Sequence, residues 1–341
     1  MTSASPSRIT GVRPLWGIEG GSVTITGDGF PVDPLPEVRI GPVAARIVAG
    51  SARELKVTVP PALDGGRTPV RLEHSPGETV FIEVGVPLAT GLHQVDNPVY
   101  DLAGNLFVTF SGARGQQVPV SIFIVRPDGS REPCVSGLPN PTSMAFDAAG
   151  RLHVSSRFDG SVYAIDSTGV ATQVATDLGV ACGIAFSADD VLFVGDRSGT
   201  ILRVEEGRAT TFATLPPSVA AFHLAFDAAG SLFVTGPTLG TRDSVYRISP
   251  EGEVSVFYEG FGRPQGLAFD DQGRLYVADA LAGGGGLFRF SADEGEPECL
   301  LAASGLVGVG FGPAGTMAIC SADTVYRLDV GVRGLLPFTR S

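Results

Sequence analysis

Asp96, Cys182 and His223 are the residues of this 341-residue chain whose types and positions best suit catalysis. Each stands four or five residues before the aspartate position of a repeated turn sequence, in three different copies of the repeat. A histidine can act as a general base, a carboxylate can orient it, and a cysteine thiolate is a nucleophile. A hydrogen-bonded histidine and a small buried cysteine are the structural alternative, and the sequence leaves both open.

Polar side chains that could bind a ligand occupy the same positions before the turn and the positions after the strand that follows it. Those before the turn are Asn97, Thr142, Ser143 and Gln265. Those after the next strand are Ser111, Arg157 and Arg197, and Arg114 lies in the longer loop Ser111–Gln117. Because antiparallel neighbours start and end at the same edge of a sheet, we expect all of these side chains at one end of the structure.

The arginines point to the charge of the ligand. Arg157 and Arg197 occupy equivalent positions in adjacent repeats, and Arg114 belongs to the repeat before them. Guanidinium groups bind carboxylates and phosphates through paired N–H donors, so an anionic ligand is one interpretation. The other is that these arginines form salt bridges with acidic residues of the chain, for which the candidates are Asp196, Asp279 and Asp166.

A sequence pattern that recurs six times after residue 95 defines these positions. It reads apolar residue, Phe or Tyr, Asp, two residues, Gly, one residue, Leu, one residue, Val, as in Ala145–Val154, Ala225–Val234 and Ala268–Val277. Counted from the aspartate position, the copies are 46, 40, 40, 43 and 42 residues apart. Asp at the first and Gly at the fourth position suit a tight type I turn between two strands.

A second hairpin follows the first in these units. Ile122–Val125 before the turn Arg126–Gly129 is an example, and a short apolar strand such as Val254–Phe257 ends the unit. Four short strands in each unit predict a propeller blade, and six units predict a six-bladed β-propeller. We expect the ring to close through a last strand near Leu335–Phe338, with help from the segment Val86–Leu88.

The units resemble NHL repeats and the related SMP-30/gluconolactonase and strictosidine-synthase-like propellers. The strongest likeness lies in Gly262–Asp270 and Gly273–Asp279, and it extends over roughly residues 90–340. The resemblance implies a functional site at one mouth of the central channel. It also implies a lactonase- or esterase-like hydrolase of the gluconolactonase superfamily among the candidate functions.

The first part of the chain has a different pattern, with apolar and polar residues alternating between frequent Gly and Pro. Gly20–Phe30, Val38–Gly41 and Leu55–Pro60 resemble the IPT/TIG family of small immunoglobulin-like β-sandwiches. We therefore predict an all-β chain with an IPT/TIG domain at residues 8–86 and a six-bladed propeller at residues 88–341. With almost no linker between them, their relative orientation is expected to be fixed.

The same resemblance suggests a metal ion. SMP-30-like enzymes hold a divalent metal at the channel with a Glu, two Asn and an Asp from four inner strands. The likeness places Asp96 at the Glu position and Cys182 at an Asn position, whereas the other equivalent positions carry Thr142, Phe222, Gln265 and Val307. Asp96 is therefore the implied metal ligand, in a set poorer in oxygen than Ca²⁺ requires. Asp96, Cys182 and His223 could instead hold Zn²⁺.

Composition limits the partners and the compartment. The chain has 24 basic and 36 acidic residues, a net charge of −12, and no basic run, which argues against nucleic acid or an anionic membrane as partner. It has no apolar stretch long enough to span a membrane, no signal-peptide pattern at the start, and four cysteines without metal or disulfide spacing. These features predict a cytoplasmic protein with reduced thiols.

Together, the patterns predict that the channel mouth binds a small polar or anionic molecule and hydrolyses or otherwise transforms it. The alternative is a non-catalytic scaffold for a ligand or a protein. Exposed aromatic residues gathered on one face would favour protein binding. A closed polar pocket would favour the small molecule.

Overall fold

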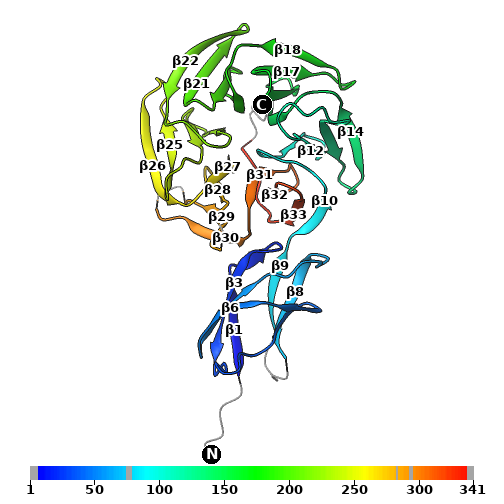
Figure 1. Ribbon diagram of the computed structural model, residues 1–341, viewed down its shortest axis with the longest axis vertical. Coiled ribbons are helices and arrows are strands. Elements are labelled where there is room, and N and C mark those ends of the chain that lie inside the picture. Colours follow the sequence, from blue (N-terminus) through cyan, green and yellow to red (C-terminus); the bar gives the residue numbers. More distant parts are fainter. Residues whose placement is uncertain (1–6, 74–78, 282, 292–294, 336–341) are drawn as a thin grey trace, which may run out of the picture.

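The structure, a computed structural model, describes residues 7–73, 79–281, 283–291 and 295–335. Within these ranges the chain forms strands and turns, with no helix. It follows that no helix in these ranges is long and apolar enough to cross a membrane. Figure 1 shows a ring of blades around a central channel and a smaller sandwich beneath it. The predicted all-β fold, a sandwich followed by a six-bladed propeller, is confirmed.

Two sheets form the N-terminal sandwich. The first has the order β1 (Arg8–Arg13), β3 (Ser22–Asp28), β7 (Glu54–Thr58) and β6 (Ile47–Gly50). The second has the order β2 (Trp16–Gly17), β9 (Val80–Val84), β8 (Gly66–Leu72), β4 (Val38–Ile40) and β5 (Val43–Ala45). Alternate side chains of each strand point inward, as Val23 and Ile25 do on β3, and they form one apolar core between the sheets.

Six antiparallel sheets of four strands form the ring, each running from an inner strand at the channel to an outer strand. The strands of blades one and two are β11 (Val99–Tyr100), β12 (Leu106–Thr109), β13 (Ile122–Val125) and β14 (Arg131–Val135), then β15 (Pro141–Phe146), β16 (Leu152–Ser156), β17 (Ser161–Ile165) and β18 (Ala171–Ala175). Those of blade three are β19 (Ala181–Phe186), β20 (Leu192–Asp196), β21 (Thr200–Glu205) and β22 (Arg208–Thr214).

The remaining blades repeat this order. The strands of blades four and five are β23 (His223–Phe226), β24 (Leu232–Thr235), β25 (Asp243–Ile248) and β26 (Val254–Phe261), then β27 (Pro264–Phe269), β28 (Leu275–Asp279), β29 (Gly286–Arg289) and β30 (Glu298–Ala302). Those of blade six are β31 (Leu306–Phe311), β32 (Thr316–Ser321), β33 (Val325–Asp329) and β10 (Val86–Ala89).

The recurrent Asp-x-x-Gly sequence sets the turn after the inner strand. In blade two, Asp147 Oδ1 accepts hydrogen bonds from the backbone N–H groups of Ala149 (3.0 Å) and Arg151 (2.8 Å). The N–H of Gly150 donates to the carbonyl of Asp147 at 2.9 Å. Gly150 has a φ of 74°, which glycine adopts without steric cost. The motif thus fixes both the turn and the register of β15 against β16.

Aromatic residues join each of the first five blades to the next. A side chain from the second strand of one blade meets the last aromatic residue of the next inner strand edge to face, with ring centroids 4.8–5.5 Å apart. The pairs are Phe107–Phe146, His153–Phe186, Phe193–Phe226, Phe233–Phe269 and Tyr276–Phe311. His153 therefore takes an aromatic packing position, where Asp147 Oδ2 lies 3.0 Å from its Nε2.

The ring closes with a strand from the beginning of the propeller sequence. β10 pairs antiparallel with β33, with Val86 opposite Arg327 and Ala89 opposite Val325. Closure through a last strand near Leu335–Phe338 is wrong as far as Leu335, which lies outside every strand; residues 336–338 are outside the described ranges. The N–H of Leu335 instead donates to Phe269 O at 2.9 Å, on the inner strand of blade five.

The sandwich is joined to the ring by main-chain pairing. β2 runs parallel to both β9 and β30, with Trp16 opposite Leu301 and Gly17 opposite Ala302. The second sheet of the sandwich is therefore continuous with blade five, as one nine-stranded sheet. Gly85 alone separates β9 from β10, and a Cβ there would lie 2.7 Å from Ile18 Cγ2. This junction fixes the orientation of the sandwich on the propeller.

Candidate functional site

The inner strands bring their first residues to one end of the channel, which we call the mouth. The ends of the second strands lie at the same end, because Pro141 pairs with Ser156 and Ala181 with Asp196. The positions four residues before the turn carry Asn97, Ser143, Gly183, His223, Gly266 and Gly308. Only three of the six blades thus present a side chain larger than hydrogen at this level.

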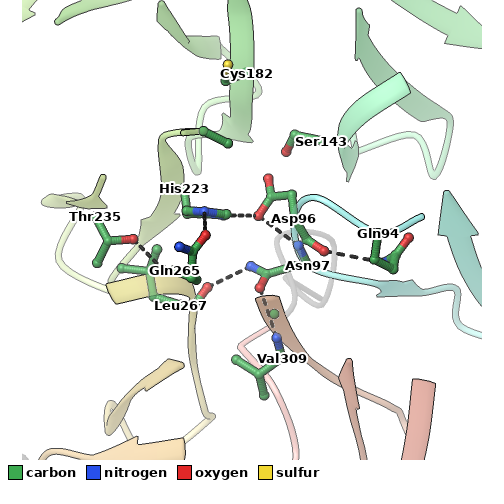
Figure 2. Close-up of polar contacts among 12 residues, drawn as sticks. Gln94, Asp96, Asn97, Ser143, Cys182, His223, Thr235, Gln265, Leu267 and Val309 are labelled. Atoms are coloured by element: carbon green, nitrogen blue, oxygen red, sulfur yellow. Dashed lines mark hydrogen bonds and ion pairs between the residues drawn. The ribbon is translucent and has the colours of Figure 1, made fainter. Parts of the chain in front are cut away.

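Asp96 and His223 are bonded to each other across the channel (Figure 2). Asp96 Oδ1 lies 2.5 Å from His223 Nδ1, and the two residues come from blades one and four, which are opposite in a six-membered ring. Asp96 is 3% exposed and His223 is 0% exposed. Asp96 Oδ1 also accepts the N–H of Asn97 at 2.7 Å. A buried carboxylate is thus compensated by a buried histidine.

Both ring nitrogens of His223 are occupied. The N–H at Nδ1 donates to Asp96, and Nε2 lies 3.2 Å from Gln265 Oε1. Both contacts are hydrogen bonds if the ring carries two protons, or if the Gln265 amide is rotated so that its NH₂ group donates. In either form no ring nitrogen is open to a ligand. His223 can act as a base toward a substrate only after Gln265 moves away.

The side chain of Asn97 connects three blades. Its amide NH₂ donates to Leu267 O at 2.9 Å, and its Oδ1 accepts the N–H of Val309 at 2.9 Å. Gly266 and Gly308 make room for it, since a Cβ at either residue would lie within 2.8 Å of Asn97 Oδ1. Asn97, predicted as a ligand-binding residue, therefore has its polar atoms engaged with the backbone. We call Asp96, Asn97, His223 and Gln265 the polar layer.

The hydroxyl residues of the predicted site contact mainly the backbone. Thr142 donates to Asn140 O at 3.1 Å, and Ser143 Oγ accepts the N–H of Ile184 at 3.1 Å. Ser111 is 0% exposed, and its Oγ has no hydrogen-bond partner. Ser111 and Ser143 thus each keep a hydroxyl proton for which no acceptor is found among the described residues.

Cys182 is a protonated thiol in this environment. Its side chain is buried, and burial raises its pKa to about 11, although the nearby Arg157 and Arg197 cations act in the opposite direction. The thiolate required of a nucleophile is therefore scarce at neutral pH. Figure 2 shows Cys182 apart from His223, and no described hydrogen bond joins them. The structure thus gives Cys182 no general base.

Arg157 is the central member of a cationic group at the mouth. Burial lowers the pKa of its guanidinium, and the neighbouring Arg197 and Arg114 lower it further, while the Cys182 thiol acts in the opposite direction. Its Nη2 donates to Gly112 O at 3.2 Å, whereas its buried Nε has no partner. We call Arg114, Arg157 and Arg197 the arginine cluster.

The surroundings of the arginine cluster are held by main-chain contacts. Arg197 donates to Ser218 O (3.2 Å) and Val219 O (2.9 Å). His93 adds an imidazole nearby, with a pKa lowered by burial and by the Arg157 cation. Among the described residues, no acidic side chain pairs with any member of the cluster.

Salt bridges from these arginines to Asp196, Asp279 or Asp166 are not formed, so that interpretation is wrong. Asp196 Oδ1 accepts the N–H of Val180 at 2.7 Å, and Asp279 Oδ1 accepts that of Arg263 at 2.7 Å. Asp166 Oδ1 accepts N–H groups of its own turn. These carboxylates stabilise loops, and the cluster is left without a counter-ion from the chain.

Two buried residues that the sequence analysis missed position the site. Asn140 adopts a φ of 43° and binds the loop that carries Arg114, accepting the N–H of Gly115 at 2.6 Å and donating to Ala113 O at 2.8 Å. Gln94 Nε2 donates to Asp96 O at 3.3 Å, and its Oε1 accepts both polar hydrogens of Thr109. Asn140 stands between two prolines, a pattern that marks an irregular backbone.

The donor set does not fit a metal centre. No group of three or more His, Cys, Asp and Glu side chains is placed to hold a metal ion in the described parts of the chain. Asp96 and His223 are bonded to each other, and Cys182 is a thiol whose proton would have to be displaced. No reaction step is therefore assigned to a metal here.

Both parts of this chain are similar to known proteins. Residues 6–83 match the family model of the IPT/TIG domain. No curated protein sequence matches the chain. Among solved structures, a putative gluconolactonase has 18% identity and a TM-score of 0.60, covering 73% of this chain and 92% of its own. Regucalcin, a calcium-binding protein of Agrobacterium tumefaciens, has 15% identity and a TM-score of 0.59, with coverages of 74% and 95%.

A third solved structure aligns over both units. It is an auxiliary nutrient binding protein of Bacteroides ovatus, with 11% identity, a TM-score of 0.54, and coverage of 97% of this chain and 98% of its own. Similarities at identities this low show a shared fold and give no evidence of a shared chemistry. Residues 6–83 thus match the IPT/TIG domain, and the six-bladed propeller that follows has the fold of the gluconolactonase- and regucalcin-like structures.

Proposed function

We propose that the mouth of the propeller binds a small anionic molecule through the arginine cluster. The observation that carries this proposal is the state of Arg157. Its guanidinium is partly buried, has one hydrogen bond to the chain, and lies close to two further cations without a carboxylate partner. Desolvated like charges are unfavourable, and a bound carboxylate or phosphate would compensate them with charge-assisted hydrogen bonds.

The attraction of an anion to the mouth is local rather than long-range. The chain carries a net charge of −12, so its overall field repels anions. An anion therefore gains from contact with Arg157 and its neighbours only at short range. This supports a small ligand that contacts the arginine cluster directly.

Binding is better supported than hydrolysis. Both ring nitrogens of His223 have partners, the Cys182 thiol has a pKa of about 11, and the described residues offer no metal cluster. The names of the neighbours span both functions, since one is a putative gluconolactonase and another a nutrient binding protein. A lactonase-like activity would require Gln265 to swing away from His223.

A protein-binding face is the second candidate, favoured by apolar side chains on the loops of the mouth. Phe158 follows Arg157 directly, and Leu239 and Leu281 lie on loops of blades four and five; Leu239 is 91% exposed. Phe158 is one aromatic residue rather than a group of them, and the three come from separate blades. The anionic small molecule therefore has the stronger support.

Calorimetric titration with D-gluconate, citrate and inorganic phosphate tests the proposal. At least one probe should bind, and Arg157→Gln should weaken it about tenfold or more, the loss of one charge-assisted contact. Arg208→Gln is the matched control, because Arg208 is an exposed arginine on the outer strand β22 of the blade that carries Arg197. Absence of binding by all three probes, or equal weakening in both variants, would overturn the proposal and favour the protein-binding face.

A further inference from the structure

The channel beyond the polar layer contains a cavity of about 340 Å³. Its walls come from three consecutive residues of every inner strand. Nearest the polar layer are Pro98, Met144, Ile184, Leu224, Leu267 and Val309. Next are Val99, Ala145, Ala185, Ala225, Ala268 and Gly310, followed by Tyr100, Phe146, Phe186, Phe226, Phe269 and Phe311.

The middle set of residues faces the channel. In a strand, alternate residues point the same way, so the position of Ala225 shares its direction with His223, whose side chain crosses the channel. Ala145, Ala225 and Ala268 are only half-buried although they lie deep in the ring. Five of the six blades thus place alanine or glycine where a larger side chain would fill the channel, and the void results from this choice.

One end of the cavity lies at the turns opposite the mouth, where Asp227, Gly334 and Leu335 also line it, and the other end lies at the polar layer. The cavity extends to Ala188 and Ala228, which are exposed residues of the turns opposite the mouth. At the other end it is lined by Asp96, Asn97 and Ser143. A ligand in the cavity would therefore place one end at the polar layer and its body between the alanine and aromatic walls.

Asp96 offers an unused acceptor at that end. Its Oδ1 takes both the hydrogen bonds from His223 and Asn97, while no hydrogen bond to Oδ2 is found among the described residues. Figure 2 shows this second oxygen pointing away from His223. Asp96 is 3% exposed and lines the cavity, and its Oδ2 is not among the fully buried atoms that lack a partner, so this oxygen can accept a donor from a ligand. The hydroxyl of the nearby Ser143 also has no acceptor among the described residues, so this end of the cavity offers both a donor and an acceptor.

We propose that this cavity is a second binding site, for a small apolar molecule that ends in a hydrogen-bond donor, an ammonium or a hydroxyl group. The apolar body contacts the alanine and aromatic walls, which exclude water. The donor end satisfies Asp96 Oδ2, and a carboxylate end would be repelled there. The site lies on the other side of the polar layer from the arginine cluster, and the proposal does not depend on anion binding at the mouth.

Three probes with one ring and different ends test the site: cyclohexylamine, cyclohexanol and cyclohexanecarboxylate. Titration followed by calorimetry should show binding of the amine, the alcohol or both, and binding of the carboxylate about tenfold weaker or absent. Measuring in Arg157→Gln as well as in the unchanged protein separates the two sites. Channel binding should persist in that variant, whereas any binding of the carboxylate at the mouth should decrease.

Substitutions that fill the void provide the decisive comparison. Ala225→Leu should abolish binding of the amine and the alcohol, and Ala229→Leu, in the exposed turn of the same blade, should leave it unchanged. Ala268→Leu on the adjacent blade repeats the test in case Ala225→Leu does not fold. Failure of both donor probes to bind would overturn the proposal. Binding that persists in a folded filled variant, or carboxylate binding as tight as that of the amine in Arg157→Gln, would do the same.

Discussion

The polar layer and the arginine cluster lie at the same mouth, but their charges are compensated differently. Asp96 and His223 are buried and bonded to each other, whereas Arg157 meets two other cations and no carboxylate. A closed pair of this kind stabilises the ring by linking opposite blades. A cluster left without a counter-ion is the better indication of a ligand, because the chain has not supplied the charge that would complete it.

Breaking the buried pair should have the largest effect on stability. Asp96→Ala leaves both the His223 ring and the Asn97 N–H without their acceptor in the channel, and each buried donor left unpaired costs about 1–3 kcal/mol. Urea unfolding should show this loss. The double variant Asp96→Leu with His223→Leu should lose less than Asp96→Ala, since it removes the orphaned imidazole; the Asn97 N–H lacks its acceptor in both variants, and Gln265 loses its histidine contact only in the double variant. An unchanged free energy of unfolding in Asp96→Ala would show that the pair does not hold the ring.

Crowding the polar layer should have the next largest effect. In Gly308→Ala the new Cβ would lie 2.7 Å from Asn97 Cα, which is backbone and cannot turn aside. Overpacking of this kind costs about 1–3 kcal/mol in the free energy of unfolding. Gly305→Ala is a weaker test of crowding, because nothing lies within 4 Å of its added Cβ, and its cost comes from a φ of 63° alone. Equal losses in the two variants would contradict the tight packing around Asn97.

Removing Arg157 should separate binding from stability. Arg157→Gln deletes a cation from a group of like charges, so the free energy of unfolding should stay within about 0.5 kcal/mol of its original value or rise. Anion affinity should decrease in the same protein. Thermal unfolding with and without inorganic phosphate measures both effects. A large loss of stability without ligand would place Arg157 in the same structural class as Asp96.

The reactivity of Cys182 tests its environment, since this thiol lies near both Arg157 and Asp96. With a pKa of about 11 raised by burial, only about one thiol in a thousand is ionised at pH 8. Alkylation by iodoacetamide should therefore be slow, and its rate should rise about tenfold for each pH unit until pH approaches 11. Mass spectrometry of the Cys182 peptide measures this rate. Fast labelling at pH 7 would show a stabilised thiolate and revive the nucleophile hypothesis.

Much of this arrangement could be predicted from the sequence. The Asp-x-x-Gly turns fix where each inner strand ends, so counting back from them places Asp96, His223 and Gln265 at two adjacent positions near one end of the channel. Counting does not reveal which side chains meet. Asn97 reaches the backbone of blades five and six because Gly266 and Gly308 leave room for it, and this is a matter of three-dimensional packing.

Other features depended on interactions between distant segments. Asp196 is adjacent to Arg197 in sequence, but its carboxylate accepts the backbone N–H of Val180 instead. Ring closure by β10 rather than by a C-terminal strand is a choice between two segments of similar apolar character. Such competitions are decided by long-range packing, which a local pattern does not contain.

The pairing of β10 with β33 has a consequence for how the protein is made. β10 leaves the ribosome directly after the sandwich, and β33 is synthesised only after five blades have followed. At about 5–20 residues per second, that delay is on the order of ten seconds or longer. Throughout this interval the nascent chain holds an open edge beside an already foldable domain. Synthesis of β33 is thus the event that turns an arc of blades into a ring.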